Sequence, residues 1–164
     1  MKTQTAFERL RSTTGQAWFS SSFVTLRIVL GLQFLLAGLD KFGGWSASGY
    51  LSGATGPFAT IFQSMAGNPL VDQLNIWGLT LIGLALIFGL AVRPASFFAA
   101  IMMLLYYFAQ FTDNTAHGYI DSHIIYIFVF ILFMAGGAGH IFGLDSIVSR
   151  YFSKKKHLAA LLFG

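Results

Sequence analysis

Four apolar runs, separated by polar segments, divide the amino-acid sequence. They cover residues 23–42, 74–92, 95–111 and 122–144. Each run holds about 20 residues, which in a helix is enough to cross the ~30 Å hydrocarbon core of a bilayer. Because consecutive spans run in opposite directions, the pattern predicts an all-α integral membrane protein with an antiparallel four-transmembrane-helix bundle.

Capping residues mark where three of these helices begin. Asn68 and Pro69 are an N-cap and a first-turn proline ahead of the second run,. Pro94 opens the third run after a tight turn, and Asp121 is a good N-cap for the fourth,. These signals support the division of the chain into separate helices.

The loop between the first two runs contains a short amphipathic pattern. Phe58, Ile61, Phe62 and Met65 follow the helical spacing i, i+3, i+4, i+7,. This stretch is too short to cross a membrane. We therefore expect a short amphipathic helix that lies over the end of the bundle as a lid.

Two terminal segments, 1–22 and 148–164, flank a membrane domain that covers residues 23–147. The first segment is expected to stay on the chain as a cytoplasmic or interfacial segment. A cleavable signal peptide is disfavoured because Arg27 interrupts the apolar run and no A-x-A site follows it directly,. The second segment mixes three lysines with apolar residues, which indicates an interfacial anchor on anionic lipid,. A helix that docks a partner is the alternative.

Composition and charge support the membrane class and predict an orientation. The 164 residues are 55% hydrophobic and 10% charged, whereas about a quarter of a soluble domain is charged. Seven of the ten Lys and Arg residues lie in the two terminal segments, and Arg93 lies in the turn between the second and third helices. The positive-inside rule therefore predicts a multi-pass protein of the cell membrane with both termini cytoplasmic and the two polar loops outside.

Several chemistries are excluded or disfavoured. The chain has no cysteine, which excludes disulfides, thiolate catalysis and iron–sulfur ligation within it. No metal-ligand spacing such as H-x-x-x-H occurs, so no metal site is predicted. His123 and His140 are 17 residues apart, or roughly 25 Å along a helix, and haem is not expected. The basic flanks lack interleaved aromatic residues, so nucleic acid is not an expected partner, whereas membrane lipid is.

The predicted topology brings polar residues from several helices to the outer end of the bundle. Carboxylates, an imidazole, an ammonium and phenols would meet there beside apolar walls, and such a site can bind a small polar head group and move protons. Asp113 and His117 lie in the adjoining loop. The candidate catalytic residues are Asp40, Lys41, Asp121 and His123. The candidate ligand-binding residues are Gln33, Tyr106, Tyr107 and Tyr126.

Most of these residues also have an ordinary structural explanation. Asp40 and Lys41 can form an interfacial pair, Asp121 can cap a helix, and tyrosines can belong to the aromatic belt. Their convergence favours a functional site. Arg27 lies near the inner end and is predicted to be structural, either snorkelling to the interface or pairing with Asp145.

Two motifs are more specific than the general pattern: AGLDKF at residues 37–42 and DSHIIY at residues 121–126. Together with NPL at 68–70 and GLAVR at 89–93, they make residues 23–147 resemble the DoxX/DoxD family of four-helix membrane proteins. The best-described members are membrane subunits of thiosulfate:quinone oxidoreductase, which oxidises thiosulfate to tetrathionate and reduces membrane quinone together with a second subunit. The resemblance implies that function here, with quinone as substrate and a second subunit or larger respiratory complex as partner.

Three functions stay open on the residues themselves. A quinone-site subunit of an enzyme fits phenols and an imidazole that donate hydrogen bonds beside an acid that relays protons. Acids such as Asp40 and Asp121 would repel thiosulfate from an open site. A non-catalytic structural or adaptor subunit of a respiratory complex is the main alternative. A transporter with Asp40 as proton carrier would need a polar break midway along the second or third helix, and their centres are apolar.

Overall fold

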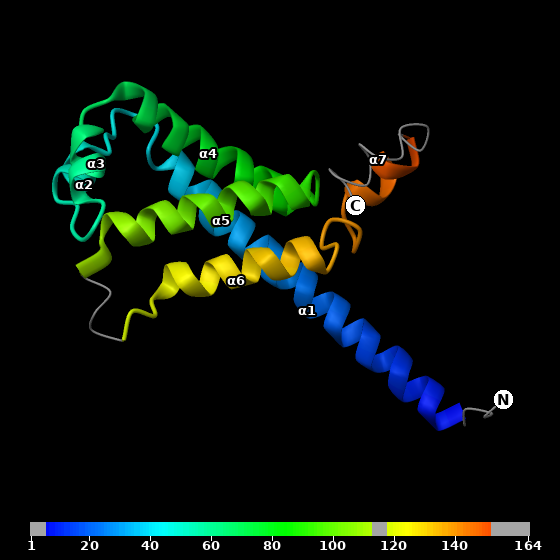
Figure 1. The fold of residues 1–164 in the computed structure, drawn as a ribbon. Helices are drawn as coiled ribbons and strands as arrows, with labels where there is room; N and C mark the ends of the chain where they lie inside the picture. The colour runs from blue at the N-terminus through cyan, green and yellow to red at the C-terminus, as the bar shows by residue number, and fades with distance from the viewer. Residues whose placement is uncertain (1–5, 113–117, 152–164) are drawn as a thin grey trace.

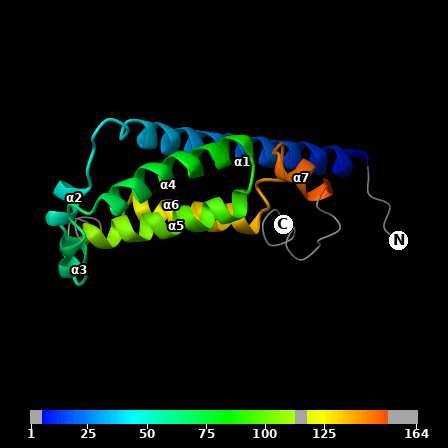
Figure 2. The ribbon, with the colours of Figure 1, turned by 90° about the horizontal axis from the view of Figure 1, so that it is seen from above.

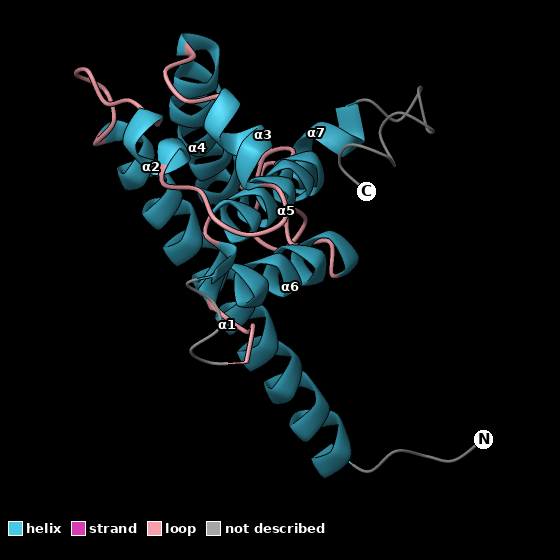
Figure 3. Ribbon diagram, turned by 60° about the vertical axis from the view of Figure 1, so that its left-hand side comes forward, coloured by secondary structure: helices cyan, strands magenta, loops and turns pink. Residues whose placement is uncertain are grey.

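The computed structural model describes residues 6–112 and 118–151, and the described chain is helical (Figures 1 and 3). It contains no β-strand in these ranges, and Thr55 and Gln110 form an isolated parallel bridge. In chain order the helices are α1 Ala6–Leu39, α2 Ser48–Ser52, α3 Ala59–Ser64, α4 Pro69–Phe88, α5 Val92–Ala109, α6 Ser122–Ala135 and α7 Asp145–Tyr151.

Three helices of the described chain are long and apolar enough to cross a membrane. Their apolar stretches are Thr14–Leu39 in α1, Pro69–Phe88 in α4 and Val92–Ala109 in α5. α6 is apolar but has 14 residues, fewer than a complete span needs,. Large apolar side chains such as Leu36 and Leu81 are exposed on the outside of these helices, as surfaces that face lipid require. The all-α membrane class predicted from the sequence is confirmed.

Several helix boundaries differ from the predicted ones: α4 ends at Phe88 and α5 already begins at Val92, and two differences are larger. α1 begins at Ala6 and continues as one helix of 34 residues, because no proline interrupts it,. Most of segment 1–22 therefore extends the first helix, and its beginning projects past the other long helices (Figures 1 and 2). α6 ends at Ala135, well before residue 144. Gly136 and Gly137 end it, since Gly137 takes a left-handed φ of +59°,.

Glycines bring α1 and α4 into close contact. A Cβ atom on Gly38 would lie 2.8 Å from the backbone nitrogen of Thr80, and one on Gly31 would lie 3.0 Å from the carbonyl oxygen of Gly83. Any side chain at these positions would push the two helices apart. α5 packs against α4 and α6 on the other side of the bundle (Figure 2). The central core contains Leu30, Phe34, Leu79, Leu86, Met103, Phe130 and Phe133.

The α4–α5 turn lies at one end of the bundle, which we call the turn end, and Arg27 is buried there with 1% of its surface exposed. Its guanidinium donates hydrogen bonds to the backbone carbonyls of Ala138, Ile141 (3.1 Å) and Phe142 (3.2 Å). These carbonyls belong to the segment after α6, where no helix satisfies them. Arg27 therefore holds that segment against α1.

Asp145, the first residue of α7, is buried as deeply as Arg27. Its carboxylate accepts hydrogen bonds from the backbone N–H groups of Ala91 (2.6 Å) and Val92 (3.1 Å). Ala91 has a left-handed φ of +52°, so the carboxylate stabilises a strained turn. Burial raises the pKa of the Asp145 carboxyl, and the two N–H donors oppose that rise. In the described chain Arg27 and Asp145 bind backbone groups and attract each other at longer range, with no direct ion pair between them.

The opposite end, which we call the loop end, is covered by the segment between α1 and α4. This segment holds two short helices, α2 and α3, where the sequence predicts one. They share a small core of Ala47, Leu51, Ala54, Phe62 and Ala109. Of the predicted amphipathic stretch, Phe62 is buried and packs on α5, whereas the other three apolar side chains are exposed.

Replacement of Arg27 by methionine is expected to lower the melting temperature of the purified protein by roughly 5–10 °C, because carbonyls with no other partner lose a charged donor. Differential scanning fluorimetry in detergent measures the change. The matched control is Leu26→Met, one residue earlier on the same helix and partly exposed, which should shift the melting temperature by less than about 2 °C. Equal melting temperatures for the two variants would contradict the assigned role of Arg27.

Candidate functional site

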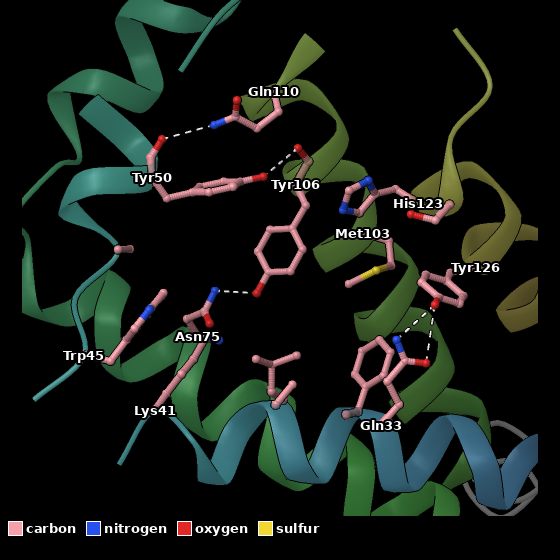
Figure 4. Close-up of a pocket in the computed structure, with 15 residues that line it drawn as sticks. Gln33, Lys41, Trp45, Tyr50, Asn75, Met103, Tyr106, Gln110, His123 and Tyr126 are labelled. Atoms are coloured by element: carbon pink, nitrogen blue, oxygen red, sulfur yellow. Dashed lines mark hydrogen bonds between the residues drawn. The ribbon is translucent and has the colours of Figure 1, made fainter. Parts of the chain in front are cut away.

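A cavity of about 520 Å³ lies at the loop end, between α1, α4, α5 and α6 (Figure 4). Its size is within the range of small-molecule sites in proteins. Its roof is the stretch of chain between α1 and α2 together with the start of α2. The lining residues are Gln33, Phe34, Ala37, Lys41, Trp45, Ala47, Tyr50, Asn75, Leu79, Met103, Tyr106, Gln110, Ser122, His123 and Tyr126.

The floor and some of the walls of the cavity are apolar. Phe34, Leu79 and Met103 line it and also belong to the central core. Polar side chains from all four helices project into the space above this floor (Figure 4). The cavity therefore suits a flat or compact apolar body that carries a few polar atoms.

Asn75 of α4 and Tyr106 of α5 form a polar pair on one wall. The Asn75 Nδ2 atom donates to the Tyr106 hydroxyl oxygen at 2.5 Å. The Asn75 Oδ1 atom is buried, and nothing in the described chain donates to it. The Tyr106 hydroxyl hydrogen likewise has no acceptor among the described residues. The Asn75 Oδ1 atom is covered by the protein, so the group of this pair that can serve a ligand is the Tyr106 hydroxyl, which Asn75 positions.

His123 and Asp121 form a second polar pair at the start of α6. The Asp121 Oδ1 atom caps the helix by accepting from the Ile124 N–H at 3.2 Å, while its Oδ2 atom binds the His123 Nδ1 atom. This contact fixes the imidazole and leaves its Nε2 atom, which no described residue binds, to exchange a proton. The ring packs edge-on to Tyr106, with centroids 6.0 Å apart. The arrangement is that of an imidazole oriented by a carboxylate for acid–base work.

Gln33 of α1 and Tyr126 of α6 meet across the cavity (Figure 4). The Gln33 Nε2 atom donates to the Tyr126 hydroxyl oxygen at 2.9 Å, and that hydroxyl lies 3.3 Å from Gln33 Oε1. This pair links two helices that are distant in sequence.

The roof is fastened to two helices. The Tyr50 hydroxyl donates to the Tyr106 carbonyl oxygen at 3.2 Å, and Gln110 Nε2 donates to the Tyr50 carbonyl oxygen at 3.4 Å (Figure 4). The Asp72 carboxylate accepts from the Ala47 N–H at 2.7 Å. At the rim, the Lys41 ammonium lies 4.6 Å from the centre of the Trp45 ring, a cation–π contact,. The cavity is thereby covered on the loop side.

Five of the eight predicted site residues line the cavity: Gln33, Lys41, Tyr106, His123 and Tyr126. Asp121 acts through His123. Asp40 is exposed just after α1 and does not line the cavity, because the lining positions 33, 34, 37 and 41 follow one helical face and residue 40 falls outside it,. Tyr107 is buried on another side of α5, where its hydroxyl donates to the Tyr119 carbonyl oxygen at 2.8 Å.

The cavity also contains polar residues that the predicted site omits. The sequence does indicate Asn75, because it is an amide within the apolar run 74–92 and lies four residues before Leu79. No sequence signal indicates Trp45 or Tyr50, because their positions depend on how the roof folds. Asp113 and His117 lie outside the described residues. Among the described residues, no group of three His, Asp or Glu side chains could hold a metal ion.

Comparison with known families identifies the family of this chain. The DoxX family model matches residues 22–111. This protein belongs to the DoxX family. The family resemblance read from the sequence is thus confirmed, and the chain is a DoxX membrane protein. The matched DoxX region supplies three walls and the roof of the cavity, while α6, which carries His123 and Tyr126, follows it. No curated protein and no solved structure matches the chain.

Replacement of Asn75 by leucine is expected to leave the melting temperature unchanged or raise it by a few degrees. The change removes one hydrogen bond but also removes a buried acceptor that has no partner. The control is Leu79→Asn, one turn further along α4, which buries a new polar group in the core and should destabilise by about 2 kcal/mol or more. A clear loss of stability in Asn75→Leu would show that Asn75 serves the fold.

Proposed function

We propose that this DoxX protein is the quinone-binding membrane subunit of an oxidoreductase, of the thiosulfate:quinone type, and that the cavity holds the quinone head group. The observation that carries the proposal is the pairing of unsatisfied polar atoms with an apolar floor. Tyr106, positioned by Asn75, offers a hydroxyl donor, and His123 offers a group that exchanges protons. A quinone and its quinol need such groups because the oxygens of the ring change from acceptors to donors.

The chemistry balances with electrons from a partner. Quinone takes up two electrons and two protons to become quinol, and two thiosulfate ions release two electrons when a sulfur–sulfur bond joins them as tetrathionate. The Tyr106 hydroxyl can donate a hydrogen bond to one quinone oxygen. His123, oriented by Asp121, can deliver a proton through Nε2,. Since the chain has no cysteine, any persulfide step belongs to the second subunit.

The cavity suits the quinone better than thiosulfate. Its lining includes one cationic side chain, Lys41, at the rim, and the floor is apolar. Moving a dianion out of water is costly unless several hydrogen-bond donors or cations surround it. We therefore assign thiosulfate oxidation to the partner subunit.

We also propose that the chain crosses the cell membrane four times, with both termini and the turn end in the cytoplasm. The distribution of Lys and Arg supports this orientation,. Two contacts support the fourth crossing. α6 starts at the loop end with His123 beside Tyr106, and the chain then reaches the turn end, where Asp145 binds the α4–α5 turn. In this arrangement α6 and the segment after it together complete the crossing.

Quinone binding is tested through Trp45, which lines the cavity. With Trp18 and Trp77 replaced by phenylalanine, Trp45 is the remaining tryptophan of the three. A decyl-tailed benzoquinone should quench its fluorescence in nanodiscs, and Asn75→Leu should weaken binding about tenfold or more because the Tyr106 hydroxyl loses the amide that positions it,. Tyr107→Phe, which alters a hydroxyl outside the cavity, is the control and should bind normally. Absence of quenching in the parent protein would favour the adaptor function.

Catalysis is tested in the complex purified with its partner subunit. His123→Ala should reduce quinone turnover by about 100-fold, the usual range for loss of an acid–base group. Asp121→Asn keeps a helix cap but loses the carboxylate that orients His123, and turnover should fall about tenfold or more. Size-exclusion chromatography confirms that each variant still assembles. Full quinone reduction by His123→Ala would rule out the proposed role, and loss of assembly instead of turnover would indicate an adaptor.

A further inference from the structure

The four long helices of the described bundle leave one weak seam, between α1 and α6. The backbones of α1 and α4, of α4 and α5, and of α5 and α6 run close together, whereas those of α1 and α6 do not. In Figure 1, α6 crosses α1 and the two helices diverge toward the loop end. Phe23 packs on Phe133 and Phe34 on Phe130, with ring centroids 5.3 and 5.4 Å apart. These aromatic pairs close the part of the seam that lies toward the turn end.

Nearer the loop end, hydrogen bonds between two side chains bridge the seam. Gln33 and Tyr126 make this bridge, and both line the cavity. Gln33 lies within the apolar span of α1, yet its side chain is exposed. An exposed amide is unfavourable against hydrocarbon. The exposed residues beside it on α1, Leu32 and Leu36, are apolar. The side of the cavity at this seam therefore meets the hydrocarbon through one pair of polar side chains.

The loop side of the cavity offers a ligand less access. Trp45, Ala47 and Tyr50 cover it, and Ala47 is buried. Hydrogen bonds from Tyr50 to α5 and from the Ala47 N–H to Asp72 of α4 hold this roof in place. A molecule arriving from water would have to open these contacts, whereas a molecule in the bilayer has to break a single side-chain bridge.

We infer that the ligand reaches the cavity sideways from the bilayer, through the α1–α6 seam, and that Gln33 and Tyr126 close this portal. The substrate class is then a lipid-borne molecule with a polar head and a long apolar tail. The head lies in the cavity, and the tail leaves between α1 and α6 to lie against lipid-facing side chains. This inference rests on the proposed quinone function and extends it from the head group to the whole lipophilic molecule.

The absence of native cysteine allows the portal to be locked chemically. Gln33→Cys and Tyr126→Cys are combined in the Trp45-only protein and joined in nanodiscs by a short bifunctional methanethiosulfonate reagent, which a reductant removes. Stopped-flow quenching of Trp45 then follows association of two probes, a tailless tetramethyl-benzoquinone and a benzoquinone with a polyprenyl tail. Each protein is compared with itself after reduction, so any effect of the two substitutions cancels. The Gln33→Cys variant treated with a monofunctional reagent controls for bulk at the portal.

With the cross-link in place, association of the polyprenyl quinone should slow about tenfold or more and recover on reduction. The tailless quinone should also associate more slowly, because its ring passes the same seam, but its equilibrium affinity should stay within about twofold, because it has no tail that the cross-link would exclude. Unchanged association of the polyprenyl quinone in the cross-linked protein would overturn the portal while leaving the quinone site intact. Absence of quenching by either probe in the reduced protein would overturn the proposed function itself.

Discussion

Two buried charges at the turn end hold together segments that are far apart in the sequence. Arg27 of α1 binds the carbonyls of the segment after α6, and Asp145 binds the N–H groups of the α4–α5 turn. Each charge is buried and satisfies backbone groups that no helix satisfies. The glycines around them are equally constrained, since a Cβ atom on Gly89 or Gly143 would lie within 3.0 Å of the Arg27 guanidinium. The rest of the bundle depends on this junction because it holds the middle of α1 against the segment after α6, and the start of α5 against the start of α7.

Because the contacts of Arg27 and Asp145 hold the bundle at the turn end, α1 and α6 can separate at the loop end. Toward the loop end α6 diverges from α1 (Figure 1), and the resulting space is a cavity instead of a continued core. The inner aromatic pairs, such as Phe34 with Phe130, form the boundary between packed core and cavity. Beyond them the inward-facing residues become amides, phenols and an imidazole. The same geometry therefore creates the volume of the site, its polarity and its weak side toward the lipid.

The roof covers the loop side of the cavity, so its sides differ in how they are closed. α2 and α3 have a small core of their own with Ala109 of α5, and Asp72 and Gln110 fasten their segment to the neighbouring helices. The roof thereby restricts access to the cavity from the loop side. On the α1–α6 side, the bridge between Gln33 and Tyr126 covers the cavity. This division suits the proposed quinone function, because excluding water strengthens hydrogen bonds and proton transfers to a bound head group.

The sequence by itself determined the membrane class, the starts of α4 and α6 at Asn68 and Asp121, and the family, because apolar run length, capping side chains and local motifs are local properties. It also indicated most of the polar residues of the site, since antiparallel helices bring alternate ends together. The tertiary structure decided the rest. Whether Asp40 or Lys41 faces the cavity depends on the rotation of α1, which Gly31 and Gly38 set by packing against α4. The pairing of Asn75 with Tyr106, the roof over them and the bridge between Gln33 and Tyr126 are contacts between distant segments, and only the packed bundle specifies such contacts.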